Sequence, residues 1–105
     1  MLRIYGVSIE VLRVIRRLDR QIGEHDRDHA RQLRRSSLSV PLNIAEGSAA
    51  SDGRRRARYT DALGSARETL ANLEAAEAIG YVEPLDAELR DKLGRIIATL
   101  INLVR

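Results

Sequence analysis

Apolar residues near the N-terminus recur at alternating steps of three and four, the spacing of one face of an α-helix. This spacing predicts a helix over residues 4–22, with its apolar face formed by Ile4, Val7, Val11, Val14, Leu18 and Ile22. Gly23 follows the last of these positions and is typical of a helix stop. Asp26 or Asp28 is then available to cap the next helix.

A second helix is expected from near His29, and its apolar positions are Leu33, Leu38, Val40, Ile44 and Ala45. Pro41 lies inside this segment, and because proline has no backbone N–H we expect a kink or a break there. The small and polar residues 47–53 predict a loop, with Ser51 or Asp52 as the cap of the following helix.

A third helix is predicted over residues 54–79, with one face formed by Tyr59, Leu63, Ala66, Leu70, Leu73 and Ala76. It should end on a left-handed Gly80, with Tyr81 folding back onto it. Pro84 suits the first turn of a fourth helix, whose apolar face is Leu85, Leu89, Leu93, Ile96, Leu100 and Leu103. Because short connections make successive helices antiparallel, the pattern predicts an all-α, up-down antiparallel four-helix bundle.

Two of the predicted helices carry apolar residues beyond one face. They are Ile97, Ile101 and Val104 on the fourth helix and Ile9 and Leu12 on the first. A helix in so small a bundle is not enclosed on all sides, so these residues predict contacts with another copy of the chain. The alternative is that they widen the intramolecular core. Since the two sets differ, a head-to-tail contact and a ring are favoured over a dimer.

The length of 105 residues fits a single domain spanning residues 1–105. The chain has no cysteine, which excludes disulfides and cysteine nucleophiles and makes the cytoplasm the expected compartment. Arginines interrupt the apolar residues of the N-terminal segment, so neither a signal peptide nor a membrane span is predicted. We therefore expect a soluble protein with no membrane partner.

Side chains suited to catalysis are scarce. His25 and His29 lie four residues apart in a predicted turn beside carboxylates, but a capped, solvated turn is favoured over a metal site because there is no third histidine. The serines lack a histidine base elsewhere in the chain, and no glycine-rich phosphate loop is present. We expect a non-enzymatic protein with no metal or cofactor.

Positive charge is concentrated in the first half of the chain. The overall net charge is +3, made up of +4 over residues 1–35, +2 over residues 36–60 and −3 over residues 61–105. Four arginines of the first helix share one face, and three more lie on the second helix; they are Arg13, Arg16, Arg17 and Arg20, followed by Arg31, Arg34 and Arg35. These residues are the candidate phosphate contacts, the alternative being an ordinary solvated face.

One segment indicates a known family. Residues 32–47 read Gln-Leu-Arg-Arg-Ser-Ser-Leu-Ser-Val-Pro-Leu-Asn-Ile-Ala-Glu-Gly, and a polar pair, Asn43 and Glu46, follows the proline in an otherwise apolar helix. This run, together with residues 63–68 and 73–81, resembles the signature of the bacterial 23S rRNA-intervening-sequence proteins. That family includes the accessory variability proteins of diversity-generating retroelements. The loop over residues 48–55 is longer than in the common form.

The resemblance implies a four-helix bundle that commonly assembles as a ring-shaped homopentamer. It also implies nucleic-acid binding, because the retroelement relatives use a basic ring surface to engage nucleic acid and a reverse transcriptase. The signature positions present here are Arg34, Arg35, Pro41, Asn43, Glu46, Gly47, Ser65 and Glu68. Their chemistry favours packing and hydrogen bonding between the second and third helices over catalysis, with Gly47 and Gly64 allowing the helices to approach closely.

The expected function is that of an oligomeric, non-enzymatic nucleic-acid-binding or RNA-associated adaptor that uses its arginine-rich helix faces. The alternative, from another functional class, is a structural or protein-interaction module in which the arginines are only solvated.

Overall fold

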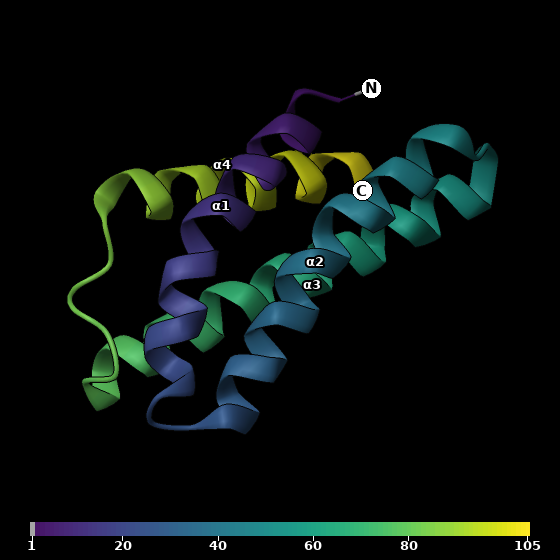
Figure 1. Ribbon diagram of the computed structural model, residues 1–105. Coiled ribbons are helices and arrows are strands. Elements are labelled where there is room, and N and C mark those ends of the chain that lie inside the picture. Colours follow the sequence, from purple (N-terminus) through teal and green to yellow (C-terminus); the bar gives the residue numbers. More distant parts are fainter. Residues whose placement is uncertain (1) are drawn as a thin grey trace.

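The computed structural model describes residues 2–105, which form four helices: α1 (Arg3–Gly23), α2 (Arg27–Ala49), α3 (Asp52–Ile79) and α4 (Ala87–Val104). Successive helices run in opposite directions (Figure 1). Contacts link α1 with α2, α2 with α3, α3 with α4, and α4 with α1, so the four helices close on one another. The predicted all-α four-helix bundle is confirmed.

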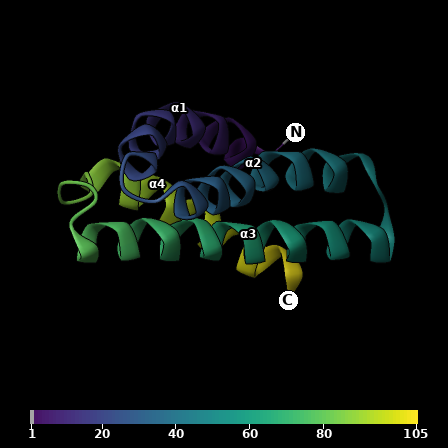
Figure 2. The ribbon, with the colours of Figure 1, turned by 60° about the horizontal axis from the view of Figure 1, so that its bottom comes forward.

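The four helices are not equally engaged. The most extensive contact is between α2 and α3, and the contact between α1 and α4 is the smallest of the four. The C-terminal end of α2 and the N-terminal end of α3 project together beyond the other two helices (Figures 1 and 2). In Figure 1, α4 crosses behind α1, and the loop over residues 80–86 connects the end of α3 to the start of α4. The molecule is therefore elongated, measuring 42 × 25 × 20 Å.

The core is aliphatic and draws on all four helices. Its fully buried large apolar side chains are Ile22, Leu33, Ile44, Leu73, Leu93, Ile96 and Leu100. Burying a side chain of this size contributes roughly 1.5–3 kcal/mol relative to leaving it in water. The bundle is therefore held together chiefly by the leucine and isoleucine stripes that the sequence displays.

Two of the predicted helix ends are confirmed. The Asp26 carboxylate accepts a hydrogen bond from the backbone N–H of His29 (3.0 Å), so Asp26 rather than Asp28 caps α2. At the end of α3, Gly80 adopts a left-handed φ of 91°, and the Tyr81 N–H donates to the Ala76 carbonyl (2.9 Å). Both turns are thus fixed by local hydrogen bonds.

The α2–α3 turn is built differently from the prediction. The expected loop over residues 47–53 shrinks to residues 50–51, because α2 continues to Ala49 and α3 begins at Asp52, which has a φ of 54°. Ser51 precedes α3 but makes no side-chain cap. Instead, the Arg55 guanidinium donates hydrogen bonds to the carbonyls of Gly47 and Ala50, satisfying the end of α2.

The expectations about the two prolines have different outcomes. α2 is one continuous helix through the buried Pro41, so the expected kink or break is not a break. A proline removes only one backbone hydrogen bond, and packing on both sides holds the helix together across that gap. Pro84 and Leu85 lie in the loop before α4, and Asp86 caps that helix by accepting from the Glu88 N–H (3.1 Å).

Three predicted core positions face solvent. Val14 is 40% exposed, whereas the neighbouring Ile15 is 2% exposed, because the 3.6-residue period carries Ile15 rather than Val14 back to the middle of the buried face. Leu38 is 50% exposed on the outer side of α2. Leu103 is 38% exposed, and Val104 packs against the core in its place.

Candidate nucleic-acid interface

The four α1 arginines are the least neutralised part of the predicted interface. Arg13, Arg16, Arg17 and Arg20 are all exposed, and none forms an ion pair with another described residue. The acids nearest to them on α1 are already engaged. Glu10 lies 3.1 Å from the Lys92 ammonium, which raises the pKa of Lys92, and Asp19 is held by Arg34. α1 therefore presents an uncompensated positive surface.

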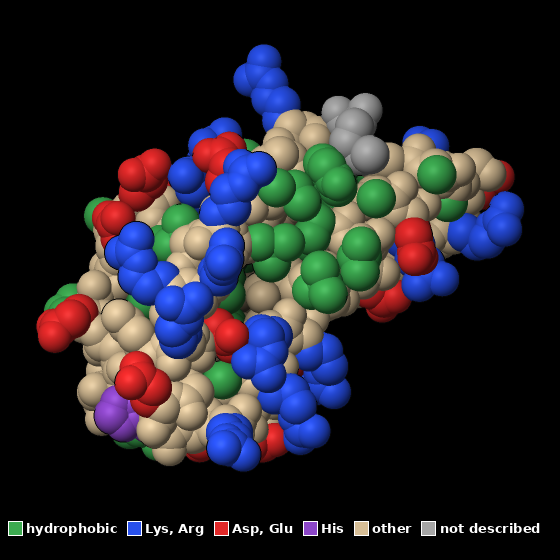
Figure 3. All heavy atoms as spheres, viewed as in Figure 1, with side chains coloured by type: hydrophobic (Ala, Val, Ile, Leu, Met, Phe, Trp, Pro, Cys, Tyr) green, Lys and Arg blue, Asp and Glu red, His purple; other side chains and the backbone are tan. Residues whose placement is uncertain are grey.

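The arginines fan out around the outer side of α1. Arg16 borders a hollow of about 230 Å³ between α1 and α2, which it shares with Leu12 and Leu38. Arg13 and Arg17 instead line a groove between α1 and the start of α4. Figure 3 shows Lys and Arg side chains spread over α1 and α2 on this face of the molecule. The positive surface therefore curves around α1, with Arg16 on the side facing α2 and Arg13 and Arg17 on the side facing α4.

The three predicted α2 arginines are each partnered. Arg31 contacts Asp28 at 2.6 Å, and this hydrogen bond lowers the pKa of Asp28. Arg34 donates to both carboxylate oxygens of Asp19, at 3.0 and 2.9 Å. Arg35 lies 4.0 Å from Glu68 on α3. Because a carboxylate offsets each of them, their free charge is smaller than that of the α1 arginines.

The signature serines form hydrogen bonds between α2 and α3. Ser65 on α3 donates to the Ser39 hydroxyl on α2 (2.9 Å), and the Asn43 amide donates to the same hydroxyl (2.9 Å) and to the Ser39 carbonyl (3.0 Å). One turn away, the hydroxyls of Thr69 and Ser36 lie 3.0 Å apart, and both residues are buried. Ser65 therefore joins α3 to α2 through the Ser39 hydroxyl, whereas both hydrogen bonds of Asn43 stay within α2.

Sequence reasoning missed Thr69 and the buried serines. Ser36, Ser37 and Thr69 are each less than 5% exposed, although hydroxyl residues are usually found at the surface. The available signal was the Ser-Ser-Leu-Ser run, which places hydroxyls beside an apolar stripe where a facing helix can satisfy them.

Glu46 and Gly47 of α2 both contact α3. A Cβ on Gly47 would lie 2.5 and 2.7 Å from ring carbons of Tyr59, so only glycine leaves room for that ring. Glu46 lies 3.1 Å from the Arg58 guanidinium on α3. The expectation that Gly64 serves the same purpose was wrong, since a Cβ there would meet no atom within 4 Å.

Two surfaces hold the residues predicted for assembly. Ile9 and Leu12 are half-buried on α1, and Leu12 shares a hollow with the exposed Leu38 of α2, which lies one helical turn from the exposed Leu42. We call these four residues the apolar patch. Hydrophobic side chains gather at this position in Figure 3. The α4 residues Ile97, Ile101 and Val104 are partly buried and pack against the core. Within a single chain, Ile97, Ile101 and Val104 of α4 are therefore partly buried, whereas Leu38 and Leu42 of the apolar patch are exposed to solvent.

The two histidines pack around an aromatic ring. His25 stacks on Tyr81 with ring centroids 4.9 Å apart, and His29 meets the same ring edge-on at 5.9 Å. His29 Nε2 also lies 2.9 Å from the Asn72 carbonyl oxygen. They join the α1–α2 turn to the α3–α4 loop. Across residues 2–105 no three His, Asp or Glu side chains gather as metal ligands, and no described helix is long and apolar enough to span a bilayer.

Comparisons with known proteins agree with this fold. The chain superimposes with a TM-score of 0.83 on a crystal structure of a protein of unknown function from the S23 ribosomal protein family of Bacteroides thetaiotaomicron. The two are 23% identical, and the alignment covers 97% of this chain and 98% of the other. No curated protein matches the sequence. The model of the 23S rRNA-intervening sequence proteins matches residues 1–102, and the chain therefore belongs to that family.

Proposed function

We propose that this chain is a cytoplasmic, non-enzymatic, oligomeric adaptor that binds nucleic acid through the arginine face of α1. The observation that supports it is the contrast in pairing between the two helices. Arg13, Arg16, Arg17 and Arg20 of α1 have no carboxylate partner among the described residues, whereas Asp28, Asp19 and Glu68 offset Arg31, Arg34 and Arg35 of α2. An uncompensated row of guanidinium groups is suited to phosphates, which it can bind with paired hydrogen bonds.

The dimensions of the row suit a phosphate backbone. Arg13 to Arg20 span roughly 10 Å of α1 at 1.5 Å per residue. This length covers several phosphates along the backbone of DNA or RNA. Such contacts release counterions, so binding should weaken steeply as salt is added. A row of four charges gives modest affinity in one chain, and an assembly repeats it around its symmetry axis.

Self-association is part of the proposal. The apolar patch includes Leu38 and Leu42, which are 50% and 55% exposed, and large aliphatic side chains grouped in this way favour contact with a partner surface. The half-covered Ile97, Ile101 and Val104 supply a second, different surface, as a head-to-tail ring requires. The resemblance to retroelement accessory proteins supports a pentamer with a basic surface.

Charge reversal tests this function. With Arg13, Arg16, Arg17 and Arg20 all changed to Glu, structured RNA and duplex DNA should no longer be retained in a low-salt gel-shift assay. The assembly should remain intact by light scattering, because none of the four side chains belongs to the apolar patch. If the unmodified protein retains neither nucleic acid, the proposed function is wrong.

A second candidate function, a protein-interaction module, is favoured by the exposure of the apolar patch. Affinity purification from the native cell with and without nuclease separates the two. Partners that survive nuclease treatment and the charge reversal, but are lost in a Leu38→Lys/Leu42→Lys variant whose mass by light scattering is unchanged, would identify the protein-interaction module.

A further inference from the structure

The joined ends of α2 and α3, residues 47–58, project beyond the other two helices, and we call them the helical tip (Figures 1 and 2). Two sets of contacts hold the tip together. The Arg55 guanidinium donates to the Ala50 carbonyl oxygen at 3.0 and 2.6 Å. The Tyr59 hydroxyl lies 3.3 Å from the Ser48 hydroxyl. A ligand that binds at the tip therefore meets a preformed surface, which lowers the entropy cost of binding.

The helical tip is as strongly basic as the arginine row of α1. Residues 52–58 include four arginines and one aspartate, which gives a net charge of +3. Residues 13–20 of α1 have the same four arginines and one aspartate in a stretch one residue longer. Figure 3 shows Lys and Arg side chains at the projecting end of the molecule as well as over α1 and α2.

Most of the positive charge at the tip is not offset by carboxylates. Only Arg58 has a close carboxylate partner, Glu46, at 3.1 Å. Arg55 bonds to carbonyl oxygens, which leave its charge in place. The guanidinium groups of Arg54 and Arg56 are exposed and form no ion pair or hydrogen bond with another described residue.

The fold itself does not account for Arg54 and Arg56. α3 begins at Asp52, so both arginines lie close to the N-terminal end of a helix, where the helix dipole disfavours positive charge. Arg55 offsets this cost by satisfying carbonyls at the end of α2, but its two neighbours make no such contact. Two unpaired cations at an unfavourable end of a helix point to a ligand that is negatively charged.

We propose that the helical tip is a second nucleic-acid contact, in which Arg54 and Arg56 bind phosphates of the backbone. The proposal rests on the proposed function, because the α1 row holds the nucleic acid and the tip adds to that binding. Leu12 and Leu38 border one hollow, so the α1 row begins level with Leu38. Ala50 lies twelve residues further along, roughly 18 Å at 1.5 Å per residue. The tip therefore reaches a different part of the backbone.

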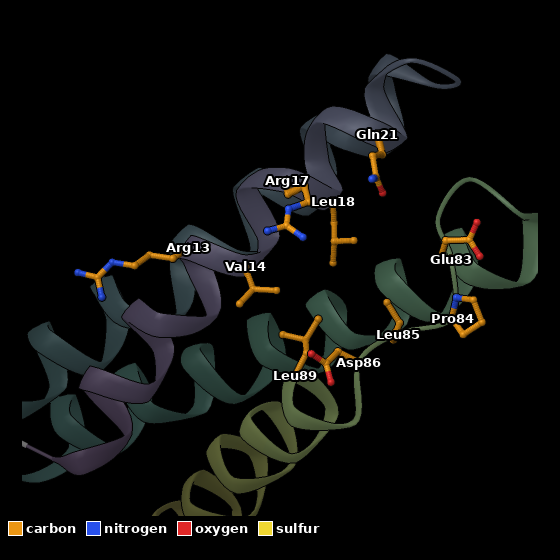
Figure 4. Close-up of a pocket in the computed structure, with 10 residues that line it drawn as sticks. All are labelled: Arg13, Val14, Arg17, Leu18, Gln21, Glu83, Pro84, Leu85, Asp86 and Leu89. Carbon is orange, nitrogen blue, oxygen red and sulfur yellow. The ribbon is translucent and has the colours of Figure 1, made fainter.

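A protein partner is the other class of ligand for a basic surface, and the tip lacks what such a partner needs. Protein interfaces have an apolar core, but residues 51–58 are all exposed and include no aliphatic side chain larger than alanine. Large aliphatic side chains gather instead in the groove between α1 and the loop before α4, where those of Val14, Leu18, Leu85 and Leu89 point toward one another (Figure 4). Phosphate contacts need only exposed cations, so nucleic acid is favoured at the tip.

The first test measures salt dependence in the full chain with α1 unchanged. Arg54→Gln/Arg56→Gln should reduce the slope of log affinity against log salt by about two for a duplex DNA, since two phosphate contacts are lost. Its matched control is Arg67→Gln/Arg95→Gln, which removes the same charge from two exposed arginines on α3 and α4 and should keep the slope. The melting temperature of the tip variant should not fall, because neither side chain has a partner in the fold.

The second test locates the nucleic acid directly. The chain has no cysteine, so a single Cys can carry an iron chelate that cleaves nearby backbone. Ser51→Cys places the chelate at the tip, where the serine makes no side-chain cap. Ala71→Cys is the control, because it is exposed on α3, on the side of the molecule away from α1 (Figure 2). End-labelled duplex DNA and an end-labelled RNA hairpin are compared, and the one cleaved from Ser51→Cys identifies the nucleic acid at the tip.

The two proposals fail in distinguishable ways. If the tip variant keeps the full slope, or if Ser51→Cys cleaves neither nucleic acid more than Ala71→Cys does, the tip is not a contact and its arginines are left to an acidic protein partner. The proposed function then still stands, provided that the charge reversal on α1 abolishes binding. Equal losses of slope in the tip variant and its control would also overturn the inference, because overall charge would explain both. If the unmodified protein binds neither nucleic acid at low salt, both proposals are wrong.

Discussion

Gly47 of α2 lies against the ring of Tyr59 on α3, which is 5% exposed. Changing Gly47 to Ala would place a methyl group 2.5 Å from a ring carbon, and the enclosed ring has little freedom to move away. We expect this overpacking to lower the free energy of unfolding by about 1–3 kcal/mol. Urea denaturation monitored by circular dichroism measures the change.

Gly64 provides the matched control, because it lies inside α3 and a Cβ there would meet no atom within 4 Å. Gly64→Ala should leave stability unchanged or raise it by up to about 1 kcal/mol, since alanine is the better helix former. Equal losses in the two variants would show that Gly47 has no special packing role.

Glu77 holds the α3–α4 loop from the last turns of α3. Its carboxylate accepts the Leu85 N–H at 2.6 Å and lies 3.3 Å from the Arg90 guanidinium. The hydrogen bond from Leu85 lowers the pKa of Glu77 below its ordinary value of 4.5, and Arg90 adds to the effect. The carboxylate therefore stabilises the fold above pH 4.5, and that contribution is lost as the pH falls through the lowered pKa.

Glu77→Gln should consequently lower the melting temperature near pH 7. The difference from the unmodified protein should shrink as the pH is taken below 4.5, where the carboxyl group of the unmodified protein becomes protonated. Thermal melts across this range check the prediction. A difference that stays constant or grows with acidification would contradict it.

At the scale of helices, the α2–α3 contact depends on hydroxyl groups as well as on apolar packing. Thr69 is fully buried, 3.0 Å from the Ser36 hydroxyl and 2.8 Å from the Ser65 carbonyl oxygen. Thr69→Val keeps the shape and removes these hydrogen bonds, so we expect a loss of about 0.5–1.5 kcal/mol in unfolding free energy.

Thr60→Val on the exposed side of α3 is the control for Thr69→Val. The Thr60 hydroxyl bonds to the Arg56 carbonyl but is open to water, so its removal should change stability by less than about 0.5 kcal/mol. A Thr69→Val variant as stable as Thr60→Val would show that the buried hydroxyls do not hold the two helices together.

The number and direction of the helices could be predicted from the sequence because the apolar stripes and stop signals are strong. The sequence did not determine which residues at the edge of each apolar face are buried, or whether a helix continues through a proline. Val14 lies at the edge of the buried face of α1, and how far such an edge position is covered depends on packing against the other helices, which leaves it 40% exposed. Continuity of α2 through Pro41 is likewise a property of its tertiary contacts.

The candidate site could be predicted only in part. Helical spacing placed the four α1 arginines on one side, but pairing depends on tertiary geometry. Arg34 meets Asp19 across fifteen residues of sequence, and no local pattern signals that contact. Glu83 and Asp86 line the groove between α1 and the start of α4 together with Arg13 and Arg17. They come from a loop whose path depends on where α3 ends and α4 begins.

At the scale of the whole molecule, assembly should depend on the outer stripe of α4. Changing Ile97 and Ile101 together to Lys should give a smaller species by light scattering at tens of micromolar. It should remain helical, because Leu93, Ile96 and Leu100 stay in the core. An unmodified protein that is monomeric at that concentration, or a double variant of unchanged mass, would contradict the proposed interface.

The central claim is that the uncompensated α1 arginines contact phosphates, and the salt dependence of binding tests it most directly. The affinity for one duplex is measured over a range of salt concentrations for two variants that each change four exposed arginines to Gln. One changes Arg13, Arg16, Arg17 and Arg20, and its control changes Arg27, Arg67, Arg95 and Arg105, which also have no described carboxylate partner.

Both variants lose the same net charge, so only the position of the lost charges differs. The α1 variant should reduce the slope of log affinity against log salt by about one for each phosphate contact removed, while the control keeps most of the slope. Equal slopes in the two variants would show that the protein attracts nucleic acid only through its overall charge, and would contradict an interface on α1.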